Sequence, residues 1–184
     1  MRAYKFLRPG GVGPFSRYAW PLPRADRPGA WVISGGGTVL CHSGIHACRV
    51  ADLPWWLQDE LWEAELDGEV ATGRHKVTAP RARLVRRVDA WDAACARRFG
   101  DACAQRAHGH AARAAAGTGE VMPDAARIAT AMAGDAATRA RSGAAIVAAY
   151  IAVHTAARVD GPAAVADERA WQAGWLAAEL SLDS

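Results

Sequence analysis

The sequence predicts an α+β protein in which a small, mostly antiparallel N-terminal sheet packs against a C-terminal Ala-rich helical bundle. Residues 1–89 contain short strand-like segments separated by Pro and Gly turns. Residues 90–184 are rich in Ala and place apolar side chains at helical spacing. Five of the eight tryptophans lie in the first 62 residues. No low-complexity linker separates the two regions, so we expect them to pack as one unit.

The first region is expected to form six short strands, at residues 3–7, 31–34, 38–41, 61–66, 76–79 and 82–88. The dipeptide Asp67-Gly68 is a strong turn signal after the fourth strand. The segment 12–30 contains four prolines, which predicts an ordered loop rather than regular structure. Asp52 is a candidate N-cap of a short helix with Pro54 in its first turn.

The second region is expected to form about four helices, at residues 91–116, 123–139 and 143–158, with a last one ending near 180. We expect the first helix to bend or break near Gly100 or Gly109. The third is apolar on nearly all sides, which predicts the core helix of the bundle.

Composition narrows the class of protein. At 184 residues the chain is long enough to bury a core, and an apolar fraction of 51 % excludes a wholly disordered chain. No apolar run approaches the roughly 20 residues of a membrane span, and the N-terminus lacks a signal-peptide core. The expected location is the cytoplasm, where the four cysteines stay reduced.

Arginine dominates the basic residues. Of 22 basic side chains only Lys5 and Lys76 are lysines, which leaves 20 arginines. This excess is typical of a GC-rich genome, and an Arg-lined nucleic-acid site is the competing interpretation. The arginines considered for that site are Arg83, Arg86, Arg87, Arg97 and Arg98.

The most unusual segment runs from Cys41 to Cys48 and holds two thiols and two imidazoles. Thiolate and imidazole are preferred ligands of Zn²⁺ and also suit Fe²⁺, so Cys41, His46 and Cys48 are candidate metal ligands. The competing interpretation is structural, because buried free cysteine is common. A third is a nucleophilic Cys48 whose pKa the adjacent Arg49 lowers, with His46 as its base.

Two further features could contribute to a site. Glu63 and Glu65 share the polar side of the predicted strand 61–66, and paired carboxylates serve as acid and base; a solvated strand face is the simpler interpretation. Trp55 and Trp56 could line a pocket for a planar ligand, or could form the interface on which the helices dock.

The motifs Cys41-x-x-Gly-Ile-His46-Ala-Cys48 and Glu65-x-x-Gly-Glu-Val resemble an uncharacterised family found in phages and bacteria, over residues 1–88. The resemblance implies that Cys41, Gly44, His46 and Cys48 act as a unit, and it carries no activity. A weaker likeness links the chain to small ADP-ribosyltransferase-like domains, which bind NAD. It implies Tyr4 and Glu65 as candidate site residues.

Three hypotheses follow, in this order. The first is binding of a small ligand or metal at Cys41, His46 and Cys48. The second is a small-molecule enzyme with a pocket between sheet and helices, in which His46, Cys48 and Glu65 are catalytic. Its cofactor, NAD in one version, would contact Tyr4, Trp55 and Arg49. The third is a nucleic-acid-associated protein. The sequence does not indicate an oligomeric state.

Overall fold

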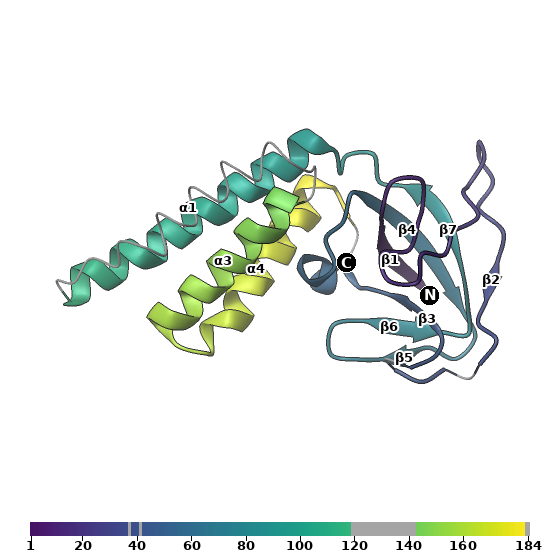
Figure 1. The fold of residues 1–184 in the computed structure, drawn as a ribbon, viewed down its shortest axis with the longest axis horizontal. Coiled ribbons are helices and arrows are strands. Elements are labelled where there is room, and N and C mark those ends of the chain that lie inside the picture. The colour runs from purple at the N-terminus through teal and green to yellow at the C-terminus, as the bar shows by residue number, and fades with distance from the viewer. Residues whose placement is uncertain (37, 41, 119–142, 183–184) are drawn as a thin grey trace. The chain divides into compact units, whose positions relative to one another are not determined.

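The computed structural model describes residues 1–36, 38–40, 42–118 and 143–182. Its backbone divides into two compact units. The strand unit consists of Met1–Trp91 together with the C-terminal residues from Leu180, and the helical unit consists of Asp92–Glu179. Antiparallel strands at the N-terminus and helices towards the C-terminus confirm the predicted α+β class (Figure 1).

The larger sheet of the strand unit contains four antiparallel strands in the order β1-β4-β7-β2. Their bounds are β1 Arg2–Leu7, β4 Glu60–Asp67, β7 Arg81–Arg87 and β2 Val32–Ile33. All four coincide with predicted strands. The predicted turn at Gly68 is also present, and its φ of +87° is a conformation that glycine adopts without strain.

The smaller sheet contains β3 Ile45–Ala47, β6 Val77–Ala79 and β5 Ala71–Thr72, in the order β3-β6-β5. The strand predicted at residues 38–41 is wrong over its described part. Val39 forms only an isolated bridge to Ser43 within a tight turn. The side chain of Val39 is exposed, so a strand at this position would gain no stabilisation from burying it. Strand pairing begins at Ile45 instead.

A backbone bridge joins the two sheets. The N–H and C=O groups of Tyr4 and Cys48 exchange two hydrogen bonds of 2.8 Å, which places the end of β3 along the edge of β1. Both sheets contribute to one core cluster, whose buried side chains are Ala3, Leu7, Trp20, Ile45, Ala47, Trp62, Ala64, Leu66, Val77, Ala79, Ala82 and Leu84.

The chain passes from β3 to β4 through the 3-10 helix η1, Val50–Trp55. It begins earlier than predicted: Arg49 occupies the N-cap position, and Asp52 lies in the first turn with its side chain buried. The carboxylate of Asp52 forms an ion pair with Arg49 at 2.6 Å, which explains why the helix tolerates a buried acidic residue.

The helical unit contains α1 Ala93–Thr118, α3 Gly143–Asp160 and α4 Ala164–Glu179 (Figure 1). The predicted helix 123–139 lies outside the described residues. The predicted break in α1 is wrong, because the helix is continuous from Ala93 to Thr118. A Cβ atom at Gly100 would lie 3.8 Å from the Cα of Ala145, which is ordinary van der Waals contact, so α1 packs directly against the backbone of α3 at this position. None of the described helices is both long and apolar enough to cross a membrane.

Candidate functional site

The predicted Cys/His segment is placed by β3. His46 lies directly opposite Thr78 of β6 in the strand register, and Cys48 pairs with Tyr4 just beyond the strand. Cys41 lies outside the described residues. Among the residues that the structure describes, no group of three or more His, Cys, Asp or Glu side chains is arranged to hold a metal ion. The metal assignment of Cys41, His46 and Cys48 stays a prediction.

Cys48 has the environment of a buried thiol. Its Sγ donates a hydrogen bond to the Tyr4 carbonyl at 3.3 Å, and burial raises its pKa to about 12 despite the nearby charges of Lys5 and Arg49. The thiolate is the nucleophilic form, so this environment disfavours a nucleophilic role of Cys48 at neutral pH. The carboxylate of Asp52 also pairs with Arg49, which reduces the effect of the guanidinium on the thiol.

Two polar atoms near the predicted segment are buried without a partner. They are Nε2 of His46 and Oγ1 of Thr78, which belong to facing residues on one side of the smaller sheet. Burial, followed by the charges of Lys76 and Lys5, lowers the pKa of His46. The imidazole is therefore neutral at physiological pH. A neutral imidazole and a hydroxyl can each donate or accept a hydrogen bond.

The two lysines of the chain both lie beside His46. The ammonium group of Lys5 donates to the carbonyl of His46 and lies 5.0 Å from the ring centroid of Trp20. Nζ of Lys76 lies 6.0 Å from the ring centroid of Trp56. Neither lysine forms an ion pair with a carboxylate in the described part of the chain, so no acidic side chain there balances their positive charges.

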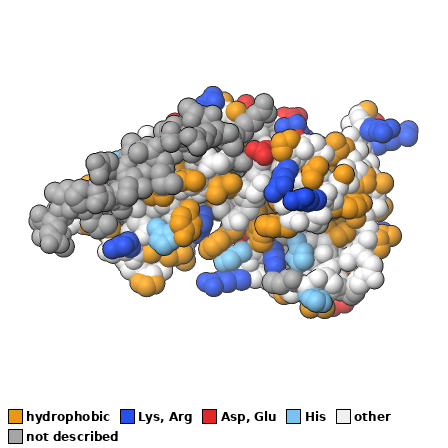
Figure 2. All heavy atoms as spheres, viewed as in Figure 1, with side chains coloured by type: hydrophobic (Ala, Val, Ile, Leu, Met, Phe, Trp, Pro, Cys, Tyr) orange, Lys and Arg blue, Asp and Glu red, His pale blue; other side chains and the backbone are white. Residues whose placement is uncertain are grey.

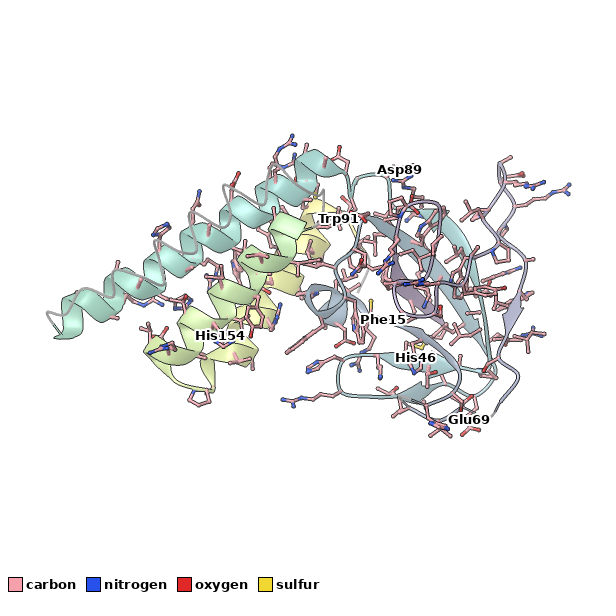
Figure 3. The ribbon with its side chains drawn as sticks, in the orientation of Figure 1. Phe15, His46, Glu69, Asp89, Trp91 and His154 are labelled. Atoms are coloured by element: carbon pink, nitrogen blue, oxygen red, sulfur yellow. The ribbon has the colours of Figure 1, made fainter. Side chains whose placement is uncertain are left out.

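A group of aromatic side chains lies next to Lys76 and includes Trp56, the ring that Lys76 contacts. Phe15 meets Trp56 edge to face with ring centroids 6.5 Å apart, and Trp55 stacks on His75 at 4.0 Å. We call Phe15, Trp55, Trp56 and His75 the aromatic surface. Figure 3 places Phe15 and His46 in the strand unit, and on the face drawn in Figure 2 hydrophobic side chains lie beside basic and His side chains. Such mixtures suit planar, negatively charged ligands.

Two of the residues predicted to contact a cofactor have structural partners. The side chain of Tyr4 is buried beside the bridge to Cys48. The Arg49 guanidinium binds Asp52 and also donates to the carbonyl groups of Gly73 and Arg74, at 3.3 and 3.2 Å. Arg49 therefore holds the loop before β6 in place, which positions His75 and Lys76. Trp55 belongs to the aromatic surface.

The predicted carboxylates are matched by arginines. Glu65 lies in the larger sheet, apart from His46 in the smaller one, and binds Arg83 through two contacts of 2.6 and 2.7 Å. Glu63 is buried and pairs with Arg2 and Arg86, each at 2.7 Å. The catalytic role of Glu65 stays a prediction.

Most arginines considered for a nucleic-acid site are also paired. Carboxylates contact Arg83, Arg86, Arg87 and Arg98. Their charges are therefore largely balanced within the protein, whereas phosphate recognition depends on uncompensated cations.

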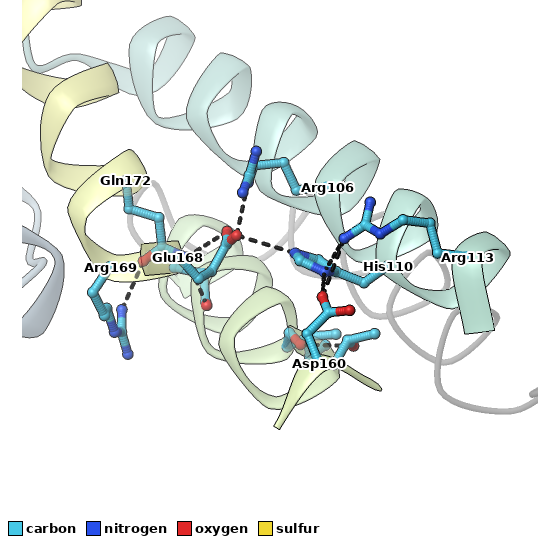
Figure 4. Close-up of polar contacts among 10 residues, drawn as sticks. Arg106, His110, Arg113, Asp160, Glu168, Arg169 and Gln172 are labelled. Atoms are coloured by element: carbon cyan, nitrogen blue, oxygen red, sulfur yellow. Dashed lines mark hydrogen bonds and ion pairs between the residues drawn. The ribbon is translucent and has the colours of Figure 1, made fainter. Parts of the chain in front are cut away.

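A polar cluster that the sequence analysis did not select lies in the helical unit (Figure 4). His110 of α1 lies between two carboxylates, with Nδ1 2.7 Å from Asp160 and Nε2 3.3 Å from Glu168. Arg106 and Arg113 complete the cluster, at 2.7 Å from Glu168 and 3.2 Å from Asp160. The spacing of Arg106, His110 and Arg113 at i, i+4 and i+7 was the available sequence signal, since it places all three on one helix face.

Lys5 gives the site a testable pH dependence. Burial lowers its pKa from 10.5 to about 8. Between these pH values the unfolded chain binds a proton that the folded protein has lost, so Lys5 makes stability rise with pH across this window. We therefore compare the wild type with Lys5→Met, which lacks this titration. Between pH 8 and 10.5 the unfolding free energy of the wild type is expected to rise by up to about 3 kcal/mol relative to that of Lys5→Met.

Urea unfolding followed by Trp fluorescence measures this difference, because six of the eight tryptophans lie in Met1–Trp91. Titration of Cys95 and Cys103 is common to both proteins and cancels, whereas Cys48 interacts with Lys5, so Cys48 is replaced by Ala in both proteins. A difference between the two proteins that stays constant from pH 8 to 10.5 would show that the pKa of Lys5 is not lowered.

No protein-family model matches the chain, and neither does a curated protein or a solved structure. The resemblance to a phage and bacterial family and the likeness to ADP-ribosyltransferase-like domains therefore stay predictions.

Proposed function

We propose that the strand unit binds a small anionic ligand at a site formed by His46, Thr78, Lys5 and Lys76. The observation that supports this most strongly is the pair of buried atoms without a partner, His46 Nε2 and Thr78 Oγ1. An unsatisfied buried polar group costs about 1–3 kcal/mol, and folded proteins retain few of them. Both atoms are shielded from solvent, so a ligand reaches them only by displacing neighbouring side chains; by hydrogen-bonding to both atoms it would recover this free energy on binding.

The charge of the site favours an anion. Two lysines without carboxylate partners in the described chain lie beside a neutral imidazole. A carboxylate or phosphate group can accept hydrogen bonds from an ammonium, an imidazole N–H and a hydroxyl at the same time. A metal cation would instead be repelled by both lysines, and Cys48 would have to give up its proton and its hydrogen bond to Tyr4.

Titration calorimetry with inorganic phosphate and with acetate tests the proposal. We expect at least one of the two anions to bind, and we expect His46→Ala and Lys76→Gln each to weaken binding about tenfold or more. Arg27→Gln is the matched control, since it removes one positive charge from an exposed position of the same unit. Absence of binding, or an equal loss in Arg27→Gln, would contradict the site.

Elemental analysis of the purified protein decides between the anion and the metal. A metal present in stoichiometric amount, and lost in both His46→Ala and Cys48→Ala, would support the predicted metal site in place of the anion site.

The unpartnered hydroxyl of Thr78 makes an independent prediction about stability. Without ligand, Thr78→Val is expected to leave the unfolding free energy unchanged or to raise it by up to about 1 kcal/mol, because valine removes an unsatisfied group while keeping the shape of the side chain. Thr155→Val is the control: the Thr155 hydroxyl donates to the Ile151 carbonyl at 2.9 Å, and its loss is expected to cost about 1 kcal/mol. Urea unfolding measures both variants. Destabilisation of Thr78→Val by more than the control would show that its hydroxyl has a partner.

A further inference from the structure

The aromatic surface presents a ring to solvent from an ordered loop. The side chain of Phe15 is 82 % exposed. The loop that carries it is closed by backbone hydrogen bonds, from Arg17 N–H to the Gly13 carbonyl at 3.0 Å and from Gly13 N–H to the Tyr18 carbonyl at 2.9 Å. A solvent-exposed phenyl ring on an ordered loop offers apolar surface that a ligand can bury.

The geometry of the surface suits a flat partner. The ring plane of Phe15 makes an angle of 88° with the indole plane of Trp56, so the two rings form a nearly right-angled corner. Aromatic rings gain about 0.5–1.5 kcal/mol beyond area burial from such stacked and edge-to-face contacts. A planar ring placed in this corner can stack on one side chain while its edge meets the other.

Lys76 connects the aromatic surface to the anion site. Its ammonium lies 6.0 Å from the Trp56 ring centroid, and Lys76 directly precedes β6, in which Thr78 lies opposite His46. A ligand whose acidic group binds Lys76 therefore lies beside the rings of Trp56 and Phe15. Charge complementarity at one end and ring stacking at the other define a single class of ligand.

We propose that the ligand of this site is a small planar aromatic acid, whose ring packs against Phe15 and Trp56 and whose carboxylate or phosphate binds Lys76 and His46. This inference rests on the proposed anion site and adds the ring to it. The two parts make separate contributions to affinity, so each can be removed by a different substitution.

Titration calorimetry with three probes separates the two parts: inorganic phosphate as the anion alone, 1-naphthol as the ring alone, and 1-naphthyl phosphate as both. We expect 1-naphthyl phosphate to bind at least about tenfold more tightly than phosphate. Phe15→Ala is expected to remove most of this gain and to leave phosphate binding unchanged. Lys76→Gln is expected to weaken both phosphate compounds. Phe15 is exposed, so its replacement should not affect folding.

Equal affinity for phosphate and 1-naphthyl phosphate, or an unchanged affinity in Phe15→Ala, would overturn the inference while leaving the anion site intact. Binding of 1-naphthol that requires Phe15, without any binding of phosphate, would overturn the anion site and retain the aromatic surface. Leu22→Ala is the matched control, because it removes another exposed hydrophobic side chain of the same unit. An equal loss of 1-naphthyl phosphate affinity in this control would show that the ring binds non-specifically.

Discussion

Glu168→Ala is expected to destabilise the helical unit by about 3–5 kcal/mol, which is the usual cost of breaking a buried ion pair by removing one partner. The side chain of Glu168 is almost completely buried. Its Oε2 accepts from Arg106 at 2.7 Å and faces Nε2 of His110 at 3.3 Å, and its Oε1 accepts from Gln172 at 3.4 Å. Removing the carboxylate takes the acceptor from the buried His110 and the half-buried Arg106, while Gln172 keeps its hydrogen bond to the Ala149 carbonyl.

The measurement is urea unfolding of the full chain followed by circular dichroism at 222 nm, which reports mainly on the helices. Glu179→Ala is the matched control: Glu179 pairs with Arg98 at an exposed position of the same unit, and such pairs contribute about 0–1 kcal/mol. Glu168→Gln retains the volume and removes the charge, so it separates packing from electrostatics. Equal effects of Glu168→Ala and Glu179→Ala would show that the cluster contributes no more than a surface pair.

Glu60→Ala is expected to destabilise the strand unit by about 2–4 kcal/mol, because one buried carboxylate satisfies three donors. Its two oxygens accept from the backbone N–H groups of Gly10 and Gly11, each at 3.0 Å, and from the indole N–H of Trp62 at 3.1 Å. Both glycines have positive φ, so the carboxylate holds the turn after β1 in its conformation.

Urea unfolding followed by Trp fluorescence measures this loss. The control is Glu69→Ala, an exposed acidic residue of the same unit (Figure 3), for which a change within about 0.5 kcal/mol is expected. If Glu60→Ala lowered the unfolding free energy no more than Glu69→Ala, the prediction would be wrong. Water would then have to replace the carboxylate at all three donors.

The strands of the larger sheet could be predicted because their sequences satisfy local rules. Residues 62–66 alternate apolar and acidic side chains, and Gly68 closes the strand with a turn. The alternation did not predict that Glu63 is buried. Its burial depends on Arg2 and Arg86, which reach it from the two neighbouring strands. A charge is buried only when its partners are present, and those partners are distant in the sequence.

The helices were predictable from periodicity, but the role of Gly100 was not. Glycine lowers helix propensity, which predicts a weak point in α1. In the structure α1 runs unbroken through Gly100, where it packs against the backbone of α3, so tertiary packing outweighs propensity. The cluster around His110 was missed for a related reason: its carboxylates lie 50 and 58 residues further along the chain.

The amino-acid sequence alone determined the α+β class and the main strands and helices of the described residues. These follow from periodicity, turn residues and residue type, which act over a few positions. Only the tertiary structure placed Thr78 opposite His46, brought Lys5 and Lys76 beside it, and buried Cys48 as a thiol. Strand register and burial decided these features, because a pKa and an unsatisfied hydrogen bond depend on neighbours that the chain supplies from a distance.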